Sequence, residues 1–372
     1  MEFFLLGPSR GTLGSEGLGR ESLAAGKEIK MSRKLTHGMV LFVWVLIVLA
    51  LPFSSFAAEE RWPTRPITIY IGFAPGGGMD MMGRMLADGM RKTLGVALPV
   101  VNMTGANGAI AMDHVFKQPR DGYSLYGISS AISTFPATGL SKLTYKEFGV
   151  IGIVFNNLAT FSVPYDSPIK TAKDLIEELK KGGLTGSNSG IGGMWHVPQI
   201  IVVNALGGKF KAVPYEGGAP AALAAAKKEV DFATSDLSEA LTLIRAKMVR
   251  PLFIFDDKPY NLEGVGILPP ITDFAPQIKD KLDAGKGYRA LGYAKGIPED
   301  RIKKFIDAFH EAMESKAVKD FSQKNLLPLN GTTGTEADRV FAASTQIQSW
   351  LLYDIKEAKK SPQELGIPRP GN

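Results

Sequence analysis

Short apolar runs alternate with longer amphipathic stretches along most of the chain. Ten of these runs predict β-strands, at residues 67–72, 98–101, 124–128, 150–155, 159–163, 184–187, 211–215, 230–234, 251–255 and 288–293. The stretches between them have helical spacing, as in the series Met82, Met85, Leu86, Met90 and Leu94. Strands that alternate with helices in this way predict an α/β fold with largely parallel sheets.

A glycine turn follows the first predicted strand. Residues 73–80 read Phe-Ala-Pro-Gly-Gly-Gly-Met-Asp, and a helical pattern begins at their end. A glycine turn before a helix exposes backbone N–H groups to an anion, and the missing side chains let a ligand approach closely. The alternative is that these glycines form an ordinary turn with no role in binding. The candidate ligand-binding residues in this turn are Pro75, Gly76, Gly77, Gly78, Met79 and Asp80.

Asp80 has two interpretations. An acid in the first turn of a helix is favoured by the helix dipole and can cap free N–H groups. The same carboxylate could instead face the ligand and accept from a bound water, a hydroxyl or an ammonium group. Both interpretations stay open at the level of the sequence.

Three further loops of small and hydroxyl-bearing residues follow later predicted strands, at 129–131, 186–193 and 215–220. In open α/β sheets, ligands bind beside loops at the carboxyl ends of strands. Candidate ligand-binding residues are therefore Ser129, Ser130, Ala131, Ser187, Asn188, Ser189 and Tyr215. Ordinary turn and capping chemistry is the alternative for the serines and Asn188, and a half-buried core position for Tyr215. Four such loops predict two lobes that face one cleft.

The first 57 residues depart from this pattern. A basic start at 31–34, an apolar stretch at 39–51 and small residues up to Ala57 predict a secretory signal peptide over 31–57, cleaved after Ala57. The alternative is an uncleaved N-terminal anchor, although the apolar stretch is short for a transmembrane helix. Residues 1–30 show no persistent pattern, and we expect them to be misassigned upstream translation before a start at Met31. A processed protein of this kind is expected in the periplasm.

Composition narrows the class of function. The chain has 43 Lys and Arg against 37 Asp and Glu, a net charge of +6 that falls to +4 once residues 1–57 are removed. A mildly basic chain without Lys/Arg blocks disfavours a nucleic-acid partner. The absence of cysteine excludes a disulfide framework, a thiol nucleophile, a Cys zinc site and a lipidated cysteine.

Enzyme motifs are not matched. A phosphate-binding loop needs Lys-Ser/Thr after its glycines, where this chain has Met79-Asp80, and Asn188 stands where a hydrolase elbow needs Ser. We expect no catalysis, no cofactor and no metal. The remaining enzyme hypothesis is a secreted hydrolase or isomerase that uses Asp80 and His196 as a dispersed acid/base pair. A ligand-sensing module for a membrane partner is a third possibility.

Several segments come in the order of a known family. They are Trp62-Pro63, Arg65-Pro66-Ile67, the turn at 73–80, Asp121-Gly122-Tyr123-Ser124-Leu125, the loop at 186–193, and Val213-Pro214-Tyr215-Glu216-Gly217-Gly218. From about residue 62 to residue 367 the chain resembles the Bug family of extracytoplasmic substrate-binding proteins, which are associated with tripartite tricarboxylate transporters. The resemblance implies a two-lobed, periplasmic-binding-protein-like (type II) flytrap, each lobe a mainly parallel sheet flanked by helices. Lobe 1 would comprise 58–160 and 287–372 and lobe 2 would comprise 161–286, with hinges near 159–163 and 288–293.

The resemblance also implies a function. Such a protein captures a small organic carboxylate, which is either a di- or tricarboxylate or an aromatic acid. It passes this ligand to integral membrane transporter subunits, and we expect the protein itself to be a monomer. Two places depart from the family pattern: Met79 stands where a small or hydroxylated residue often occurs, and Tyr288-Arg289-Ala290 occupies a region that usually carries tryptophan. Together with Trp195, Met79 predicts a larger or more apolar carboxylate than a simple dicarboxylate.

Overall fold

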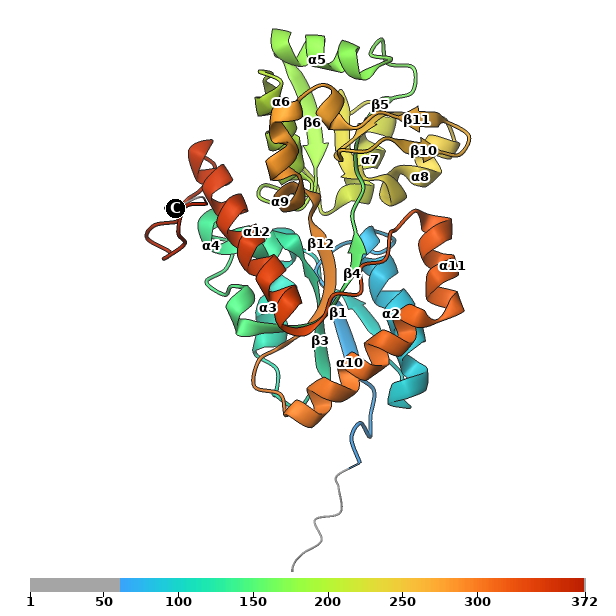
Figure 1. Cartoon of the computed structure of the whole chain (residues 1–372), viewed down its shortest axis with the longest axis vertical. Helices are drawn as coiled ribbons and strands as arrows, with labels where there is room; N and C mark the ends of the chain where they lie inside the picture. Colours follow the sequence, from blue (N-terminus) through green and yellow to red (C-terminus); the bar gives the residue numbers. More distant parts are fainter. Residues whose placement is uncertain (1–60, 371–372) are drawn as a thin grey trace, which may run out of the picture. The chain divides into compact units, whose positions relative to one another are not determined.

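The computed structural model describes residues 61–370, apart from the side chains of residues 283 and 284. The predicted upstream segment and signal peptide therefore lie outside the described residues. The described part of the chain is one compact unit. It contains two five-stranded sheets, each flanked by helices on both faces, and a small two-stranded hairpin (Figure 1).

The first sheet has the strand order β2-β1-β3-β12-β4. Its strands are β1 (Thr68–Ile71), β2 (Val100–Asn102), β3 (Ser124–Ser129), β4 (Phe148–Asn156) and β12 (Tyr288–Ala294). β1 pairs in parallel with β2 and β3, whereas β12 runs antiparallel to both β3 and β4. Four of the five strands therefore share one direction.

Helices cover both faces of this sheet. One face packs on α2 (Gly78–Leu94) and α10 (Glu299–Glu314), and α11 (Lys316–Asn325) lies against α2 and α10. The other face packs on α3 (Ala109–Phe116) and α12 (Gly334–Asp354). Side chains of β4 are buried along almost its whole length because helices lie on both sides, which explains the unbroken apolar run in its sequence.

The second sheet has the order β7-β6-β8-β5-β9. Its strands are β5 (Ala159–Pro164), β6 (Leu184–Asn188), β7 (Phe210–Pro214), β8 (Phe232–Asp236) and β9 (Val249–Ile254). Here β5 is the strand that runs against its neighbours, β8 and β9. The flanking helices are α5 (Ala172–Lys181), α6 (His196–Ala205), α7 (Gly218–Ala226) and α8 (Leu237–Arg245).

Short elements complete the chain. The hairpin pairs β10 (Tyr260–Leu262) with β11 (Gly266–Leu268). The shorter helices are α4 (Phe135–Thr138) and α9 (Leu282–Lys286), and the 3-10 turns are η1 (Ala106–Gly108), η2 (Ser130–Thr134), η3 (Tyr145–Glu147), η4 (Ile271–Asp273) and η5 (Pro276–Lys281).

The chain passes between the two sheets at two places. Asn157 and Leu158 join β4 of the first sheet to β5 of the second, and Gly287 joins α9 to β12. The first sheet thus takes strands from both ends of the described sequence. The segment before α12 also pairs with β4, where the Asn156 N–H donates to the carbonyl of Pro328.

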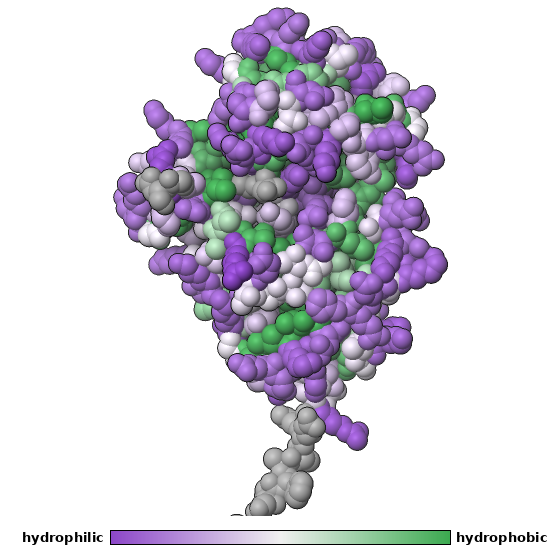
Figure 2. Space-filling view, in the orientation of Figure 1, coloured by the Kyte–Doolittle hydropathy of each residue, from purple (hydrophilic) through white to green (hydrophobic). Residues whose placement is uncertain are grey.

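The predicted fold class is confirmed: two sheets of mostly parallel strands are flanked by helices in a two-lobed, solute-binding-protein fold. All ten predicted strands are present, with ends that shift by at most two residues, and the hairpin β10–β11 was not predicted. Within residues 61–370, no helix combines the length and the apolar character that crossing a membrane requires. The face in Figure 2 is mostly polar, with apolar patches between the polar side chains.

Candidate ligand-binding site

The glycine turn forms the N-terminus of α2. Gly77 is the N-cap residue without a side-chain cap, and Gly78 is the first helical residue. The Gly78 N–H donates to Oε1 of Glu239, over 3.1 Å, although Glu239 belongs to α8 beside the second sheet. Pro75 and Gly76 are exposed on the outer side of the turn. The turn therefore brings the N-terminus of one helix against a carboxylate from the other lobe.

Asp80 is occupied within its own helix turn and the adjacent strand. Its Oδ2 accepts from the Gly76 N–H and from Nε of Arg84, both over 2.9 Å, and its Oδ1 accepts from Nδ2 of Asn102 over 3.0 Å. Burial raises the pKa of Asp80, but the hydrogen bonds from Arg84, Gly76 and Asn102 outweigh it, so that the pKa is lowered overall. These contacts agree with the structural interpretation of Asp80, in which its carboxylate accepts hydrogen bonds at the start of the helix.

The second loop lies next to β12. Ser129 is paired in register with Arg289, and its Oγ accepts from the Ala131 N–H. Ser130 is buried, and its Oγ has no hydrogen-bond partner among the described residues.

The third loop is held by hydrogen bonds of its own. Ser187 Oγ donates to the carbonyl of Ala221, over 2.7 Å. Asn188 donates to Gln199 through Nδ2 and accepts from the Gly190 N–H through Oδ1. Ser189 Oγ accepts from the Trp195 N–H. These side chains shape the loop from inside.

Tyr215 lies apart from the other predicted residues. Its hydroxyl donates to Oε2 of Glu229, over 3.0 Å, in an exposed contact. The neighbouring residues of the same loop, Glu216, Gly217 and Gly218, are the ones that line the cavity described below.

Two hydrogen bonds tie the third loop to the first lobe. Nδ2 of Asn107 donates to the carbonyl of Ile191 over 2.6 Å, and Oγ1 of Thr134 donates to the carbonyl of Gly192 over 2.7 Å. Asn107 belongs to η1 and Thr134 to η2, both beside the first sheet. The loops of the two lobes are thus in direct contact.

A small cavity of about 20 Å³ lies where these loops meet. Of the predicted residues, Gly77, Gly78, Met79 and Ser189 line it. The other predicted residues do not: Pro75, Gly76, Asp80, Ser129, Ser130, Ala131, Ser187, Asn188 and Tyr215. Its lining also includes Phe73, Met194 and Trp195, and the charged side chains Glu216, Glu239 and Arg289.

A buried charge cluster forms one wall. Nη2 of Arg289 lies 3.4 Å from Oε1 of Glu239 and 3.7 Å from Oδ2 of Asp236, and its guanidinium carbon is 5.7 Å from the ring centre of Trp195. Burial raises the pKa of Glu239, and the nearby Asp236 raises it further, against a lowering by Arg289. The candidate residues from the sequence did not include this cluster.

Two glycines make room for it. A Cβ on Gly78 would overlap the guanidinium of Arg289, and a Cβ on Gly218 would overlap Oε2 of Glu239 and approach Nε1 of Trp195. The backbone of both helix starts therefore approaches the charged groups as closely as only glycine allows.

Sequence signals for this cluster did exist. Arg289 is a cation inside an otherwise apolar predicted strand, and a fully buried cation is rare unless it has a partner. Asp236 and Glu239 have the spacing of a capping box, and the structure forms it: Asp236 accepts from the Ser238 N–H, and Glu239 accepts from the Asp236 N–H.

The acid/base pair considered from the sequence has no support in these contacts. Asp80 is engaged by Arg84, and His196 is buried with its Nδ1 accepting from the Gly192 N–H. Burial lowers the pKa of His196 to about 4. Neither residue lines the cavity.

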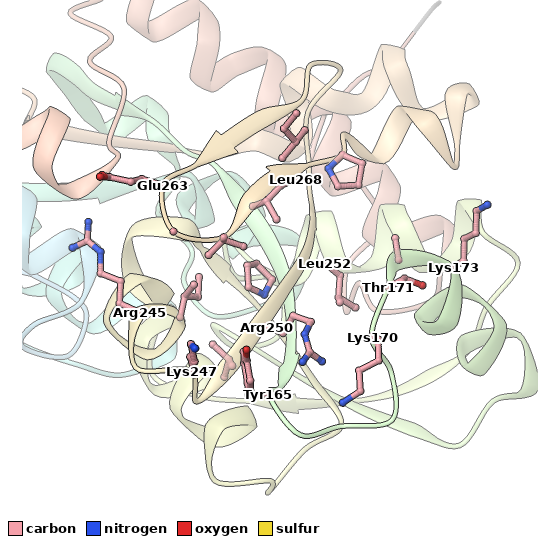
Figure 3. Close-up of a pocket in the computed structure, with 18 of the residues that line it drawn as sticks. Tyr165, Lys170, Thr171, Lys173, Arg245, Lys247, Arg250, Leu252, Glu263 and Leu268 are labelled. Carbon is pink, nitrogen blue, oxygen red and sulfur yellow. The ribbon is translucent and has the colours of Figure 1, made fainter.

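A larger hollow of about 770 Å³ lies in the second lobe, away from the four loops. Figure 3 shows Lys170 and Arg250 extending toward each other on one side of it, while Lys173 and Arg245 point outward. None of the predicted residues lines this hollow. We take the smaller cavity as the candidate site because loops from both lobes converge on it.

The fold and the cavity between its loops define a two-lobed solute-binding protein. A family model described as "Tripartite tricarboxylate transporter family receptor" matches residues 82–342, and the chain belongs to this family. The resemblance to the Bug family is thereby confirmed. The family and fold are those of solute-binding proteins that act as receptors in transport.

Individual relatives agree with this assignment. The chain is 31% identical to a UPF0065 protein of Cupriavidus necator, over 84% of this chain and 91% of that protein. It is 28% identical to a UPF0065 protein of Agrobacterium vitis, over 86% of this chain and 92% of that protein.

Solved structures share the fold. The periplasmic binding protein BugD superposes with a TM-score of 0.72 at 24% identity, covering 80% of this chain and all of that one. A Rhodopseudomonas palustris protein solved with adipate has a TM-score of 0.71 at 22% identity, and MatC from the same organism, solved with malate, has 0.66 at 20%. Each covers 79% of this chain and 98% of the other.

Proposed function

We propose that this protein binds a small organic carboxylate between its two lobes and delivers it, as a monomer, to the membrane subunits of a tripartite tricarboxylate-type transporter. One observation carries the proposal: the N-terminus of α2 at Gly78 and the buried guanidinium of Arg289 face the same cavity. A helix N-terminus and an arginine are both suited to an anion. The carboxylates bound to the R. palustris proteins support the same ligand class.

The proposed mechanism is closure of one lobe on the other. We divide the chain into lobe 1, residues 58–160 and 287–372, and lobe 2, residues 161–286. The connections at Asn157-Leu158 and at Gly287 are the places where rotation would separate the sheets. Ligand contacts made only when the lobes meet would favour the closed form.

The predicted residues enter this proposal with different roles. Gly77, Gly78, Met79 and Ser189 line the cavity, and we assign them to direct ligand contact. The hydrogen bonds of Ser129, Asn188 and Asp80 point to a supporting role, since each holds a loop that borders the cavity.

A thermal-shift screen tests the ligand class. Mono-, di- and tricarboxylates, aromatic acids, sugars and cations are each added to the exported protein. A carboxylate at about 100 times its Kd is expected to stabilise the fold by about 2.7 kcal/mol. Shifts with sugars or cations, and with no carboxylate, would contradict the proposal.

The proposed location is the periplasm, after removal of a signal peptide at Ala57. Mass spectrometry of the protein from a periplasmic extract tests this, with an expected N-terminus at Ala58. A chain that keeps residues 31–57 in the membrane fraction would favour the anchor instead.

A further inference from the structure

We propose that Arg289 receives the carboxylate of the ligand, and that Glu239 is an internal carboxylate which the ligand replaces at that position. This inference rests on the proposed function, because it concerns the same cavity and a carboxylate ligand. It adds the group that binds the anion, the group that competes with it, and a narrower ligand class: an acid with one carboxylate and an apolar body.

Arg289 has unused hydrogen-bonding capacity at the cavity. It is fully buried, and none of Nε, Nη1 and Nη2 has a hydrogen-bond partner among the described residues. A guanidinium offers five N–H donors in a planar fork that matches the two oxygens of a carboxylate. The nearest carboxylate oxygens, those of Glu239 and Asp236, are 3.4 and 3.7 Å away and leave these donors unsatisfied.

Glu239 already stands where an anionic ligand would stand. Its Oε1 accepts from the Gly78 N–H at the start of α2 and is also its closest oxygen to Arg289. The two groups best suited to a ligand carboxylate are therefore engaged by a carboxylate of the protein. The remaining space of about 20 Å³ is enough for one water molecule. An acid of several carbons can take this position only if Glu239 leaves it.

Glu239 is freer to leave than its neighbour Asp236. Asp236 accepts three hydrogen bonds: its Oδ2 accepts from the Leu158 N–H, and its Oδ1 accepts from both the N–H and the hydroxyl of Ser238. Glu239 has one hydrogen bond to Gly78 and one to the Asp236 N–H. When Glu239 moves away, Asp236 still caps α8 and still balances the charge of Arg289. The exchange replaces one carboxylate with another and leaves the charge beside Arg289 unchanged.

The lining limits the ligand to a single carboxylate. Arg289 is the one basic side chain among the described residues that line the cavity, and Glu216 and Glu239 are acidic. A second carboxylate on the ligand would meet these acids without a cation to pair with. The lining also contains the large apolar side chains of Phe73, Met79, Met194 and Trp195, which suit an aliphatic or aromatic body.

Calorimetric titration of the exported protein tests the exchange with a matched pair of probes. Hexanoate and adipate have the same six-carbon chain and differ in one terminal carboxylate, and phenylacetate adds an aromatic body. We expect hexanoate and phenylacetate to bind at least tenfold more tightly than adipate. Tighter binding of adipate would overturn the proposed ligand class.

Variants separate the roles of the two charged residues. In Glu239→Gln the competing charge is lost while the shape is kept, and we expect the Kd for hexanoate to fall at least tenfold. Glu177→Gln removes an exposed charge on α5 of the same lobe, away from the cavity, and it serves as the control with less than a threefold change. Arg289→Lys keeps the positive charge but loses the planar set of guanidinium N–H donors, so the Kd for hexanoate should rise at least tenfold. Circular dichroism checks the fold of each variant.

The outcomes distinguish this inference from the proposed function. Unchanged hexanoate binding by Glu239→Gln would overturn the exchange, because Glu239 would then not compete with the ligand. Weaker binding would also overturn it, because Glu239 would then contact the ligand itself. In that case carboxylate binding by the wild-type protein would still support the proposed function. Absence of binding by every probe, to the wild type and to Glu239→Gln alike, would overturn both.

Discussion

Oε1 of Glu239 lies 3.1 Å from the backbone nitrogen of Gly78, although the two residues are 161 positions apart in the sequence. The contact joins the start of α8, beside the second sheet, to the start of α2, beside the first. A carboxylate at a helix N-terminus is favoured by the helix dipole. The contact therefore holds the two lobes together through the group that a ligand anion would also use.

Substitution of Gly78 should disturb this junction. In Gly78→Ala the new Cβ overlaps the guanidinium of Arg289, and we expect the free energy of unfolding to fall by about 1–3 kcal/mol. Urea unfolding measures the change. Because the clash is with one side chain, the cost should drop below about 1 kcal/mol when the same substitution is made in an Arg289→Ala background. An equal loss of unfolding free energy in both backgrounds would show that the new Cβ does not clash with Arg289.

Carboxylate affinity should depend on pH through Glu239. Burial and Asp236 raise the pKa of Glu239 in the present arrangement, and Arg289 lowers it. A ligand that displaces Glu239 releases it from the burial that is the largest of these causes, so the pKa of Glu239 falls in the complex. The complex then binds fewer protons than the free protein, and affinity should decrease as the pH falls from 8 to 6, by at most about tenfold per unit for one proton.

Titrations of hexanoate at several pH values measure this dependence. The probe remains ionised throughout that range, because carboxylic acids titrate at about pH 4. Glu177 is exposed on α5 and does not line the cavity, so Glu177→Gln is the control and should keep the wild-type dependence. Glu239→Gln should lose it, and a slope that persists in this variant would assign the proton to another group.

His196 should make the fold sensitive to mild acid. Burial lowers its pKa to about 4 in the folded protein, against about 6.5 in the unfolded chain. The unfolded state therefore binds more protons between these values, so this contribution to stability is complete above pH 6.5 and is lost as the pH falls toward 4. The loss is on the order of 3 kcal/mol for such a shift.

Urea unfolding at pH 7, 5.5 and 4.5 checks this effect. In His196→Gln the part of the pH dependence that comes from His196 should disappear, since an amide oxygen can still accept from Gly192 and does not titrate. His310 is exposed, and His310→Gln is the control that should keep the wild-type curve. Identical curves for His196→Gln and the wild type would contradict the assignment.

Much of the fold could be predicted from the sequence because local pattern and burial agree. Strand β4 is apolar along its length since helices cover both of its faces, and α2 shows helical spacing because one side packs on the sheet. The hairpin β10–β11 was missed for the opposite reason: its strands are three residues long, and Ile267 and Val265 are exposed, so burial imposes no pattern.

The cavity was only partly predictable. Gly78 and Ser189 stand in recognisable turns, and both line it. Arg289 and Glu239 were not among the predicted site residues because their meeting depends on the packing of two lobes, which no short segment encodes. Tyr215 shows the converse, since its loop borders the cavity while its own side chain turns outward to Glu229.

Thr134 should control how readily the lobes separate. Its Oγ1 has one hydrogen and lies 2.7 Å from the carbonyl oxygen of Gly192 in the other lobe and 2.8 Å from that of Ala131 in its own segment. Thr134→Val keeps the shape and removes the donor, so the closed form loses its hydrogen bond to Gly192, about 0.5–1 kcal/mol because the open form of the wild type keeps the bond to Ala131. We therefore expect the ratio of open to closed protein to rise about two- to fivefold.

Small-angle X-ray scattering without added carboxylate measures the opening as an increase in the radius of gyration. The matched control is Thr138→Val, because Thr138 is also buried and its Oγ1 donates within its own segment, to the carbonyls of Thr134 and Phe135, while valine keeps the methyl group that lies near Gly192. The control loses a hydrogen bond without loosening the contact between lobes, so its radius of gyration should match the wild type. If both variants expand equally, the effect comes from local destabilisation, and the Thr134–Gly192 hydrogen bond does not govern closure.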